Sequence, residues 1–150
     1  MNSASFFVLA LTAGSAMAFQ VVVNTQLRRF VGMPMIATLF SMAIGSAAAL
    51  LYCVVARYPV PSVAEMRQSP WWAWLGGFVG VFYLWCSVVV SPRLGVSLTL
   101  ALVVAGQIVT SVIIDHFGLL GAALRPLSTG RLTGVCLLVL GVAMITYYRE

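Results

Sequence analysis

The sequence has little charge and no lysine. Only 7% of its 150 residues are charged, whereas soluble domains carry about 25%. Its arginines stand singly or in pairs at the ends of apolar stretches, as in the loops of membrane proteins rather than in a patch that binds nucleic acid. Because 62% of the residues are hydrophobic, we predict an all-α integral membrane protein with no nucleic-acid partner.

Residues that hold metals or form catalytic clusters are also scarce. Cys53, Cys86 and Cys136 lie in three different apolar stretches without a CxxC pattern, so neither a disulfide framework nor a zinc site is indicated. His116 is the only histidine, and adjacent Asp115 does not share a helix face with it. We therefore predict no catalytic residue, no metal site and no cofactor, and a protein that is not an enzyme.

Long apolar stretches, bounded by arginine, proline and glycine, make up most of the chain. Each is long enough to cross the roughly 30 Å hydrocarbon core as a helix. The first continues past Ala16-Met17-Ala18 without a preceding basic residue, so we interpret it as a membrane helix rather than a signal peptide. All six prolines are expected outside helix interiors, with Ser91-Pro92-Arg93 as a tight turn. The single transmembrane domain, residues 1–150, would comprise helices at about 6–27, 34–55, 70–90, 95–117 and 132–148.

Polar side chains within these helices indicate where a functional interior lies. Gln107 is near the middle of the fourth helix, and Ser111 and Asp115 follow at intervals of four on the same face. Polar groups on membrane helices usually face the bundle interior or a water-filled cavity. We predict that the solute is bound by Gln107, Gln20, Asn24, Tyr83, Trp85 and Ser111. The alternative is that these are structural contacts between helices, worth about 0.6 kcal/mol each.

The arginines favour neither orientation in the membrane. With five helices, side A holds Arg57, Arg67, Arg125 and Arg131, and side B holds Arg28, Arg29, Arg93 and Arg149. Orientation normally follows an excess of Lys and Arg on the cytoplasmic side. The tie reflects either chance in a small count or insertion in both orientations. Two antiparallel copies would form ten helices with the inverted-repeat symmetry common in secondary transporters.

An ion pair is expected near the side A end of the fourth helix. In an antiparallel pair of chains, Arg28 of one copy shares a depth with Asp115 of the other. Two such pairs, made and broken in turn, would gate the two faces of the membrane. The alternatives are an intrachain pair of Asp115 with Arg125 or Arg131, or simple solvation of Asp115.

Short motifs recur in order along almost the entire chain. They are Gln20-x-x-x-Asn24-x-x-Leu27, Pro34-x-x-Ala37-x-x-x-Ser41, Trp74-Leu75-Gly76-Gly77, Pro92-Arg93-Leu94-Gly95, Gly106-Gln107, Asp115-His116-Phe117-Gly118 and Arg131-x-x-Gly134. This series resembles the five-helix YdcZ-like family of the drug/metabolite transporter superfamily. The resemblance implies half of a ten-helix transporter in the bacterial inner membrane, with the first, third and fourth helices lining the cavity. Small multidrug resistance exporters carry a deep glutamate in the first helix, where this chain has Gln20 and Asn24, which argues against proton-coupled cation export.

These features together predict a secondary-type transporter that moves a small polar or cationic solute by alternating access as an antiparallel dimer. Its partners would be a second copy of itself or a paralogous subunit, membrane lipid and the solute. The alternative is a non-transporting membrane protein that acts as an assembly or interaction partner.

Overall fold

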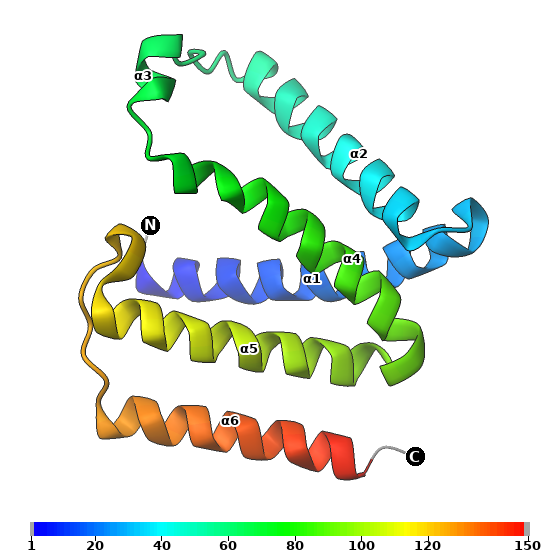
Figure 1. The fold of residues 1–150 in the computed structure, drawn as a ribbon, viewed down its shortest axis with the longest axis vertical. Helices are drawn as coiled ribbons and strands as arrows, with labels where there is room; N and C mark the ends of the chain where they lie inside the picture. Colours follow the sequence, from blue (N-terminus) through cyan, green and yellow to red (C-terminus); the bar gives the residue numbers. More distant parts are fainter. Residues whose placement is uncertain (1, 149–150) are drawn as a thin grey trace. The chain divides into compact units, whose positions relative to one another are not determined.

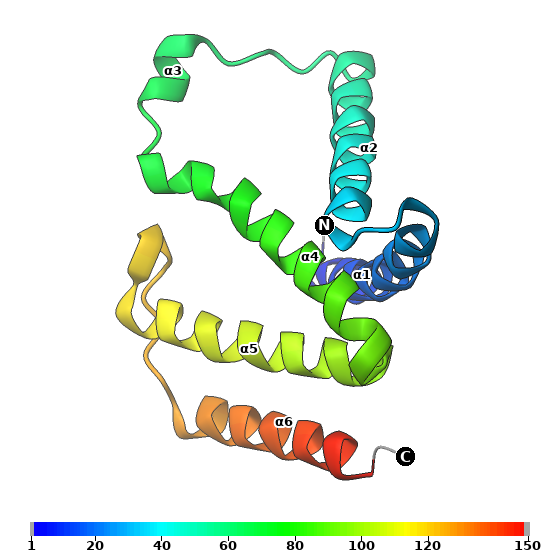
Figure 2. The same cartoon turned by 45° about the vertical axis from the view of Figure 1, so that its right-hand side comes forward.

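Helices account for most of the computed structural model, which describes residues 2–148 (Figures 1 and 2). Arg149, counted above on side B, lies outside the described residues. The elements are α1 (Ser3–Val31), α2 (Pro34–Val55), α3 (Val63–Arg67), η1 (Trp71–Leu75), α4 (Gly76–Leu94), α5 (Val96–Phe117), η2 (Leu119–Gly121) and α6 (Thr129–Tyr147).

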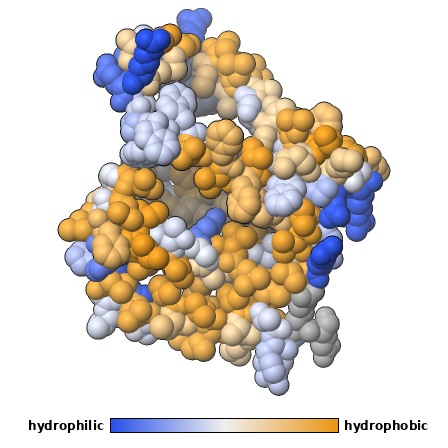
Figure 3. Space-filling model, viewed as in Figure 1, coloured by the Kyte–Doolittle hydropathy of each residue, from blue (hydrophilic) through white to orange (hydrophobic). Residues whose placement is uncertain are grey.

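Five segments within residues 2–148 are long and apolar enough to cross a membrane, which confirms the prediction of an all-helical chain with five such helices. They are Ala4–Val31, Pro34–Val55, Trp71–Leu94, Val96–Phe117 and Thr129–Tyr147. Apolar side chains dominate the face shown in Figure 3, and strongly hydrophilic ones gather over α3 and over the connection from α1 to α2. This distribution suits helices whose outer faces contact lipid. The chain divides into two compact units, Met1–Arg93 and Leu94–Glu150.

In unit 1, α1 and α2 form a hairpin closed by two residues. Gly32 has a φ of 81°, in the left-handed region that glycine tolerates best, and its N–H donates to the Arg28 carbonyl at 2.9 Å. Pro34 follows at the first helical position, where its missing N–H costs nothing. The buried residues of α2, Ala37 and Thr38, lie near this turn. Beyond it the two helices diverge (Figures 1 and 2), so the packed part of unit 1 is at the turn.

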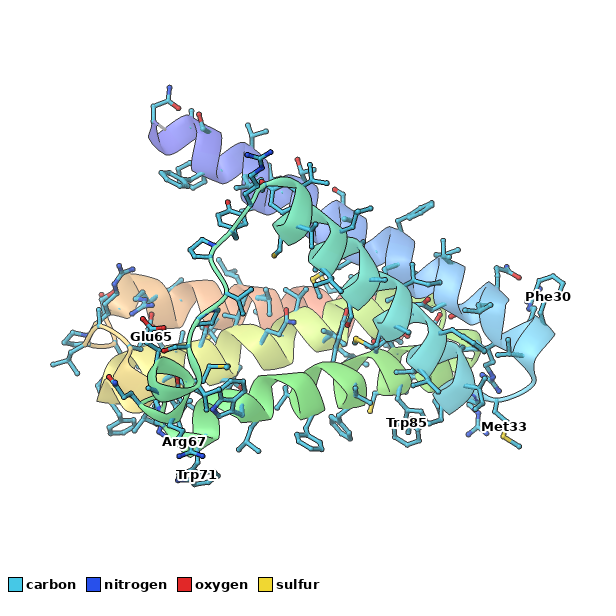
Figure 4. The ribbon with its side chains drawn as sticks, turned by 90° about the horizontal axis from the view of Figure 1, so that it is seen from above. Phe30, Met33, Glu65, Arg67, Trp71 and Trp85 are labelled. Atoms are coloured by element: carbon cyan, nitrogen blue, oxygen red, sulfur yellow. The ribbon has the colours of Figure 1, made fainter. Side chains whose placement is uncertain are left out.

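The connection from α2 to α4 contains one short helix that we did not predict. α3 begins with a capping box: the Ser62 N–H donates to a Glu65 carboxylate oxygen at 2.7 Å, and the Glu65 N–H donates to the Ser62 hydroxyl at 3.3 Å. The hydrogen bonds from Ser62 lower the pKa of the Glu65 carboxyl. Glu65 lies near Trp71 at one end of the unit, whereas Phe30 and Met33 lie at the other (Figure 4).

The course of α4 corrects two of our expectations. Pro92 lies inside this helix, which continues to Leu94, and the turn is at Gly95 with a φ of 81° rather than at Ser91-Pro92-Arg93. A proline inside a helix removes the N–H that would bond to the carbonyl four residues earlier. Here that carbonyl belongs to Val88, and the Arg28 Nη1 of α1 donates to it at 3.2 Å. The arginine therefore supplies the donor that Pro92 lacks.

In unit 2, α5 and α6 form a second helical hairpin. Gly118 ends α5 in the left-handed conformation, with φ 60°, and its N–H donates to the Ile114 carbonyl. Ser128 caps α6 by accepting from the Arg131 N–H at 3.3 Å. Because of this cap, α6 begins at Thr129, slightly earlier than the sequence indicated.

Candidate functional site

Asn24 is the most deeply buried of the predicted site residues. It lies on α1 and is 3% exposed, and its Nδ2 amide has no hydrogen-bond partner among residues 2–148. Gln20, one turn earlier on the same face, is exposed. A buried donor without a partner carries a desolvation cost of about 1–3 kcal/mol. Asn24 is therefore poorly explained as a structural contact within the chain.

Tyr83 on α4 presents the same situation. Its hydroxyl is buried and has no hydrogen-bond partner in the described part of the chain. Its backbone carbonyl accepts from the Ser87 hydroxyl at 2.9 Å, and the neighbouring side chains Leu84 and Val88 are fully buried. Among the other buried residues of α4, Leu84 and Val88 are thus apolar and Ser87 is already paired locally.

The hydrogen bond from Arg28 to the Val88 carbonyl gives a common reference point for Asn24 on α1 and Tyr83 on α4. Both helices run toward their side B turns, so positions can be counted back from this contact. Asn24 precedes Arg28 by four residues and Tyr83 precedes Val88 by five, or about 6 Å and about 7.5 Å along the two helices. Two of the three buried, unpartnered polar groups of unit 1, those of Asn24 and Tyr83, therefore lie at similar distances along their helices from the hydrogen bond that joins α1 and α4.

Trp85 belongs to a different surface of α4. It follows Tyr83 by two positions, about 200° around the helix, so the two side chains face different directions. Trp85 lines a groove of about 690 Å³ between α2 and α4, together with Met42, Ser46 and Phe82. The Phe82 and Trp85 rings are tilted, with centroids 6.4 Å apart. Trp85 is thus available as an aromatic face in this groove.

The predicted residues of unit 2 lie along α5. Gln107, near its middle, and Ser111 are both exposed. The Ser111 hydroxyl donates to the Ile108 carbonyl at 2.9 Å, which satisfies its donor locally. Of these two residues, Gln107 is therefore the one whose side-chain amide is exposed in the middle of an apolar helix.

Asp115 takes part in an intrachain ion pair. Its Oδ2 accepts from Nη2 of Arg131 at 2.6 Å, and Nη1 of Arg131 donates to the Arg125 carbonyl at 3.0 Å. The Arg125 N–H donates back to the Asp115 carbonyl at 2.8 Å. This is the intrachain alternative of our sequence analysis, with Arg131 as the partner. His116 also joins the end of α5 to the connection before α6, because its Nδ1 accepts from the Leu127 N–H at 3.0 Å.

Exchange of charges tests whether this pair holds α5 to α6. Asp115→Arg removes the ion pair between α5 and α6 and places two cations together. We therefore expect the free energy of unfolding to fall by about 1–2 kcal/mol. Adding Arg131→Asp should restore most of that loss, whereas adding Arg57→Asp should not. Unfolding in mixed detergent and sodium dodecyl sulfate micelles measures the differences. A double variant no more stable than Asp115→Arg alone would show that the pair contributes nothing to the hairpin.

Sequence reasoning missed two features of unit 1. The Thr25 Oγ1 is buried without a partner among the described residues; it follows Asn24 directly, and no sequence signal marks it. The bond from Arg28 to the Val88 carbonyl had a sequence signal, because a proline inside a helix leaves the carbonyl four residues earlier without its backbone donor. Within residues 2–148, no group of three His, Cys, Asp or Glu side chains comes together in a way that could hold a metal ion.

Five long apolar helices that carry a few unpartnered polar groups define a multi-pass integral membrane protein. The chain belongs to the YdcZ family: its residues 5–144 match the family model described as "Putative inner membrane exporter, YdcZ". The motif resemblance is thereby confirmed, and the chain is a multi-pass protein of the inner membrane. The exporter description accords with our expectation that it is not an enzyme.

A curated relative agrees with the family match. The chain is 32% identical over 75 residues to the inner membrane protein YdcZ of Escherichia coli strain K12, an alignment that covers 50% of this chain and 50% of that protein. The match thus spans about half the length of the relative. No solved structure matches the chain.

Proposed function

We propose that this chain forms half of a secondary-type transporter that moves a small polar or cationic solute by alternating access. The family description of an inner-membrane exporter supports transport. The observation that carries the proposal is that the Asn24 amide and the Tyr83 hydroxyl are buried without a partner among residues 2–148 and lie at similar distances from the hydrogen bond that joins α1 and α4. A passing solute would give these groups the hydrogen bonds that the chain does not supply.

We further propose that the second half is another copy in the opposite orientation, or a paralogous subunit. The four-to-four distribution of arginines supports this, as does the position of Gln107 close to the midpoint of α5. A two-fold axis in the membrane plane keeps the midplane fixed, so both copies of Gln107 would lie at nearly equal depth. Tyr83 would then flank this level from opposite sides in the two copies, and the Trp85 ring could stack on a cationic solute.

The intersubunit gate between Asp115 and Arg28 stays a prediction. It would require both side chains to exchange an intrachain partner, which is Arg131 for Asp115 and the Val88 carbonyl for Arg28. Alternating access by this route would break one such set of contacts at each face in every cycle.

Solute flux into liposomes that contain only this protein tests the proposed function. Suitable solutes come from a thermal-shift screen of small polar metabolites and cationic antiseptics. We expect flux with the unaltered protein and none with Gln107→Leu, because leucine removes the amide at the shared midplane, while assembly stays intact. Gln26→Leu is the matched control, since Gln26 is an exposed amide near the side B end of α1.

The same vesicles report orientation. Glu150→Cys, in a background without the native cysteines, should react with an impermeant reagent from both sides of the membrane. Reaction from one side only would contradict the antiparallel dimer. An absence of flux for every solute that shifts the unfolding temperature would favour the non-transporting assembly partner, and wild-type flux in Gln107→Leu would exclude a central role for that amide.

A further inference from the structure

A second site lies at the side B end of unit 1, apart from Asn24 and Tyr83. A pocket of about 350 Å³ is formed there by the last turns of α1 and by α4, and its lining residues are Thr25, Arg28, Arg29, Gly32 and Pro92. This volume is at the lower end of small-ligand pockets, which run from about 300 to 1,000 Å³. Two adjacent arginines make its wall cationic.

No carboxylate of unit 1 balances this charge. The only acidic residue among residues 1–93 is Glu65, which lies at the opposite end of the unit from Phe30 and Met33 (Figure 4). Its carboxylate is engaged by Ser62 in the capping box of α3. Arg28 uses one N–H for the Val88 carbonyl, but a guanidinium has five, so donors remain on Arg28 for a second acceptor.

Thr25 gives the pocket a polar group on the membrane-interior side of the two arginines. Its Oγ1 is buried and has no partner within residues 2–148. It precedes Arg29 by one helical turn, about 6 Å along α1, and therefore sits deeper in the membrane than the guanidinium. An oxygen-rich anion seated between the two levels would accept from the arginines and from the threonine hydroxyl at once.

We propose that this pocket binds the anionic phosphodiester headgroup of a membrane phospholipid. The pocket opens at the end of a membrane-spanning helix, at the level where headgroups lie, and cationic pockets between membrane helices suit such groups. A dissolved phosphate ion shares this chemistry, but it lacks acyl chains to lie against the exposed apolar side chains of α1 deeper in the membrane, such as Val22 one turn before Thr25. The lipid would bridge α1 and α4 at the point where Arg28 already joins them.

Thermal unfolding of the delipidated protein in neutral detergent tests the proposal. Phosphatidylglycerol should raise the unfolding temperature in a saturable manner, and phosphatidylcholine should not. Arg29→Gln should weaken the apparent affinity for phosphatidylglycerol about fivefold, the contribution of one arginine near an anionic headgroup. Arg67→Gln, at the far end of the unit (Figure 4), is the matched control and should change nothing. Thr25→Val, which keeps the side-chain shape, provides a second variant and should also weaken binding.

Three results would overturn the assignment. Equal shifts with phosphatidylglycerol and phosphatidylcholine, or equal affinities for Arg29→Gln and Arg67→Gln, would show that the pocket does not select an anionic lipid. Inorganic phosphate serves as the third additive. A saturable shift with phosphate that equals the shift with phosphatidylglycerol and disappears in Arg29→Gln would overturn the lipid source in favour of a dissolved anion.

Discussion

Asn24→Leu should abolish most of the solute flux while leaving the protein as stable as before, or more stable. The Asn24 amide is buried without a partner in the described chain, so leucine removes a desolvation cost and can raise the free energy of unfolding by about 1 kcal/mol. The same change removes a hydrogen bond to the solute, and about 1.5 kcal/mol of lost binding corresponds to about tenfold in affinity. Flux in liposomes and unfolding in mixed micelles measure the two effects on the same preparations.

Tyr83→Phe tests the same idea with a smaller change, because it removes only the hydroxyl oxygen and keeps the ring. We expect a loss of flux similar to that of Asn24→Leu. Tyr52→Phe is the matched control: Tyr52 lies on α2 with its side chain 63% exposed, and its ring packs at 6.0 Å from that of Tyr58. If Asn24→Leu instead lowered stability by 1–2 kcal/mol and left flux unchanged, the amide would be a structural contact between helices.

The second large effect concerns Arg28, which should be essential to stability only while Pro92 is present. Arg28→Met leaves the Val88 carbonyl without a donor, at a cost of about 2–3 kcal/mol in the free energy of unfolding. Pro92→Ala provides a backbone N–H that can bond to this carbonyl within α4. In the Pro92→Ala background, the cost of Arg28→Met should therefore fall below about 1 kcal/mol.

The neighbouring arginine supplies the control for this double-mutant cycle. Arg29→Met removes the same charge one position later, from an exposed side chain, and in neutral detergent without anionic lipid it should change stability little in either background. Unfolding curves of the four combinations of Arg28 and Pro92 variants give the coupling energy. Equal costs of Arg28→Met with and without Pro92 would mean that the arginine acts through its charge rather than through the Val88 carbonyl.

Much of the fold could be predicted because its determinants are local or compositional. Runs of apolar residues between arginine, proline and glycine predicted five helices long and apolar enough to cross a membrane, as the structure has them. The errors are at connections. Ser62-Val63-Ala64-Glu65 is a recognisable capping-box sequence, yet α3 was not predicted. Pro92 was placed in a turn because prolines usually end helices, whereas here a side chain from another helix compensates for the missing donor.

The candidate site was less accessible to sequence reasoning, because it depends on which helix face meets another. Spacing identified Asn24 and Tyr83 as polar groups within helices, but their burial without a partner follows from the packing of unit 1. Tyr83 and Trp85 were grouped by depth, although their positions on α4 put them on different faces. The partner of Asp115 was one of several possibilities, and only the course of the connection to α6 selects Arg131.

The connections between the helices differ in length on the two sides of the membrane, which matters for insertion. On side B, α1 and α2 are separated by two residues and α4 and α5 by Gly95 alone, so each of these connections is too short to cross the bilayer independently of its flanking helices. The connections on side A are longer and include α3 and η2. Moving side B across the membrane therefore means translocating two tight tips, whereas moving side A means translocating two loops with their own structure. Under the proposed insertion in both orientations, the arginine counts of the two sides are equal but their connections differ in length, so the ratio of the two orientations should respond to loop length as well as to charge.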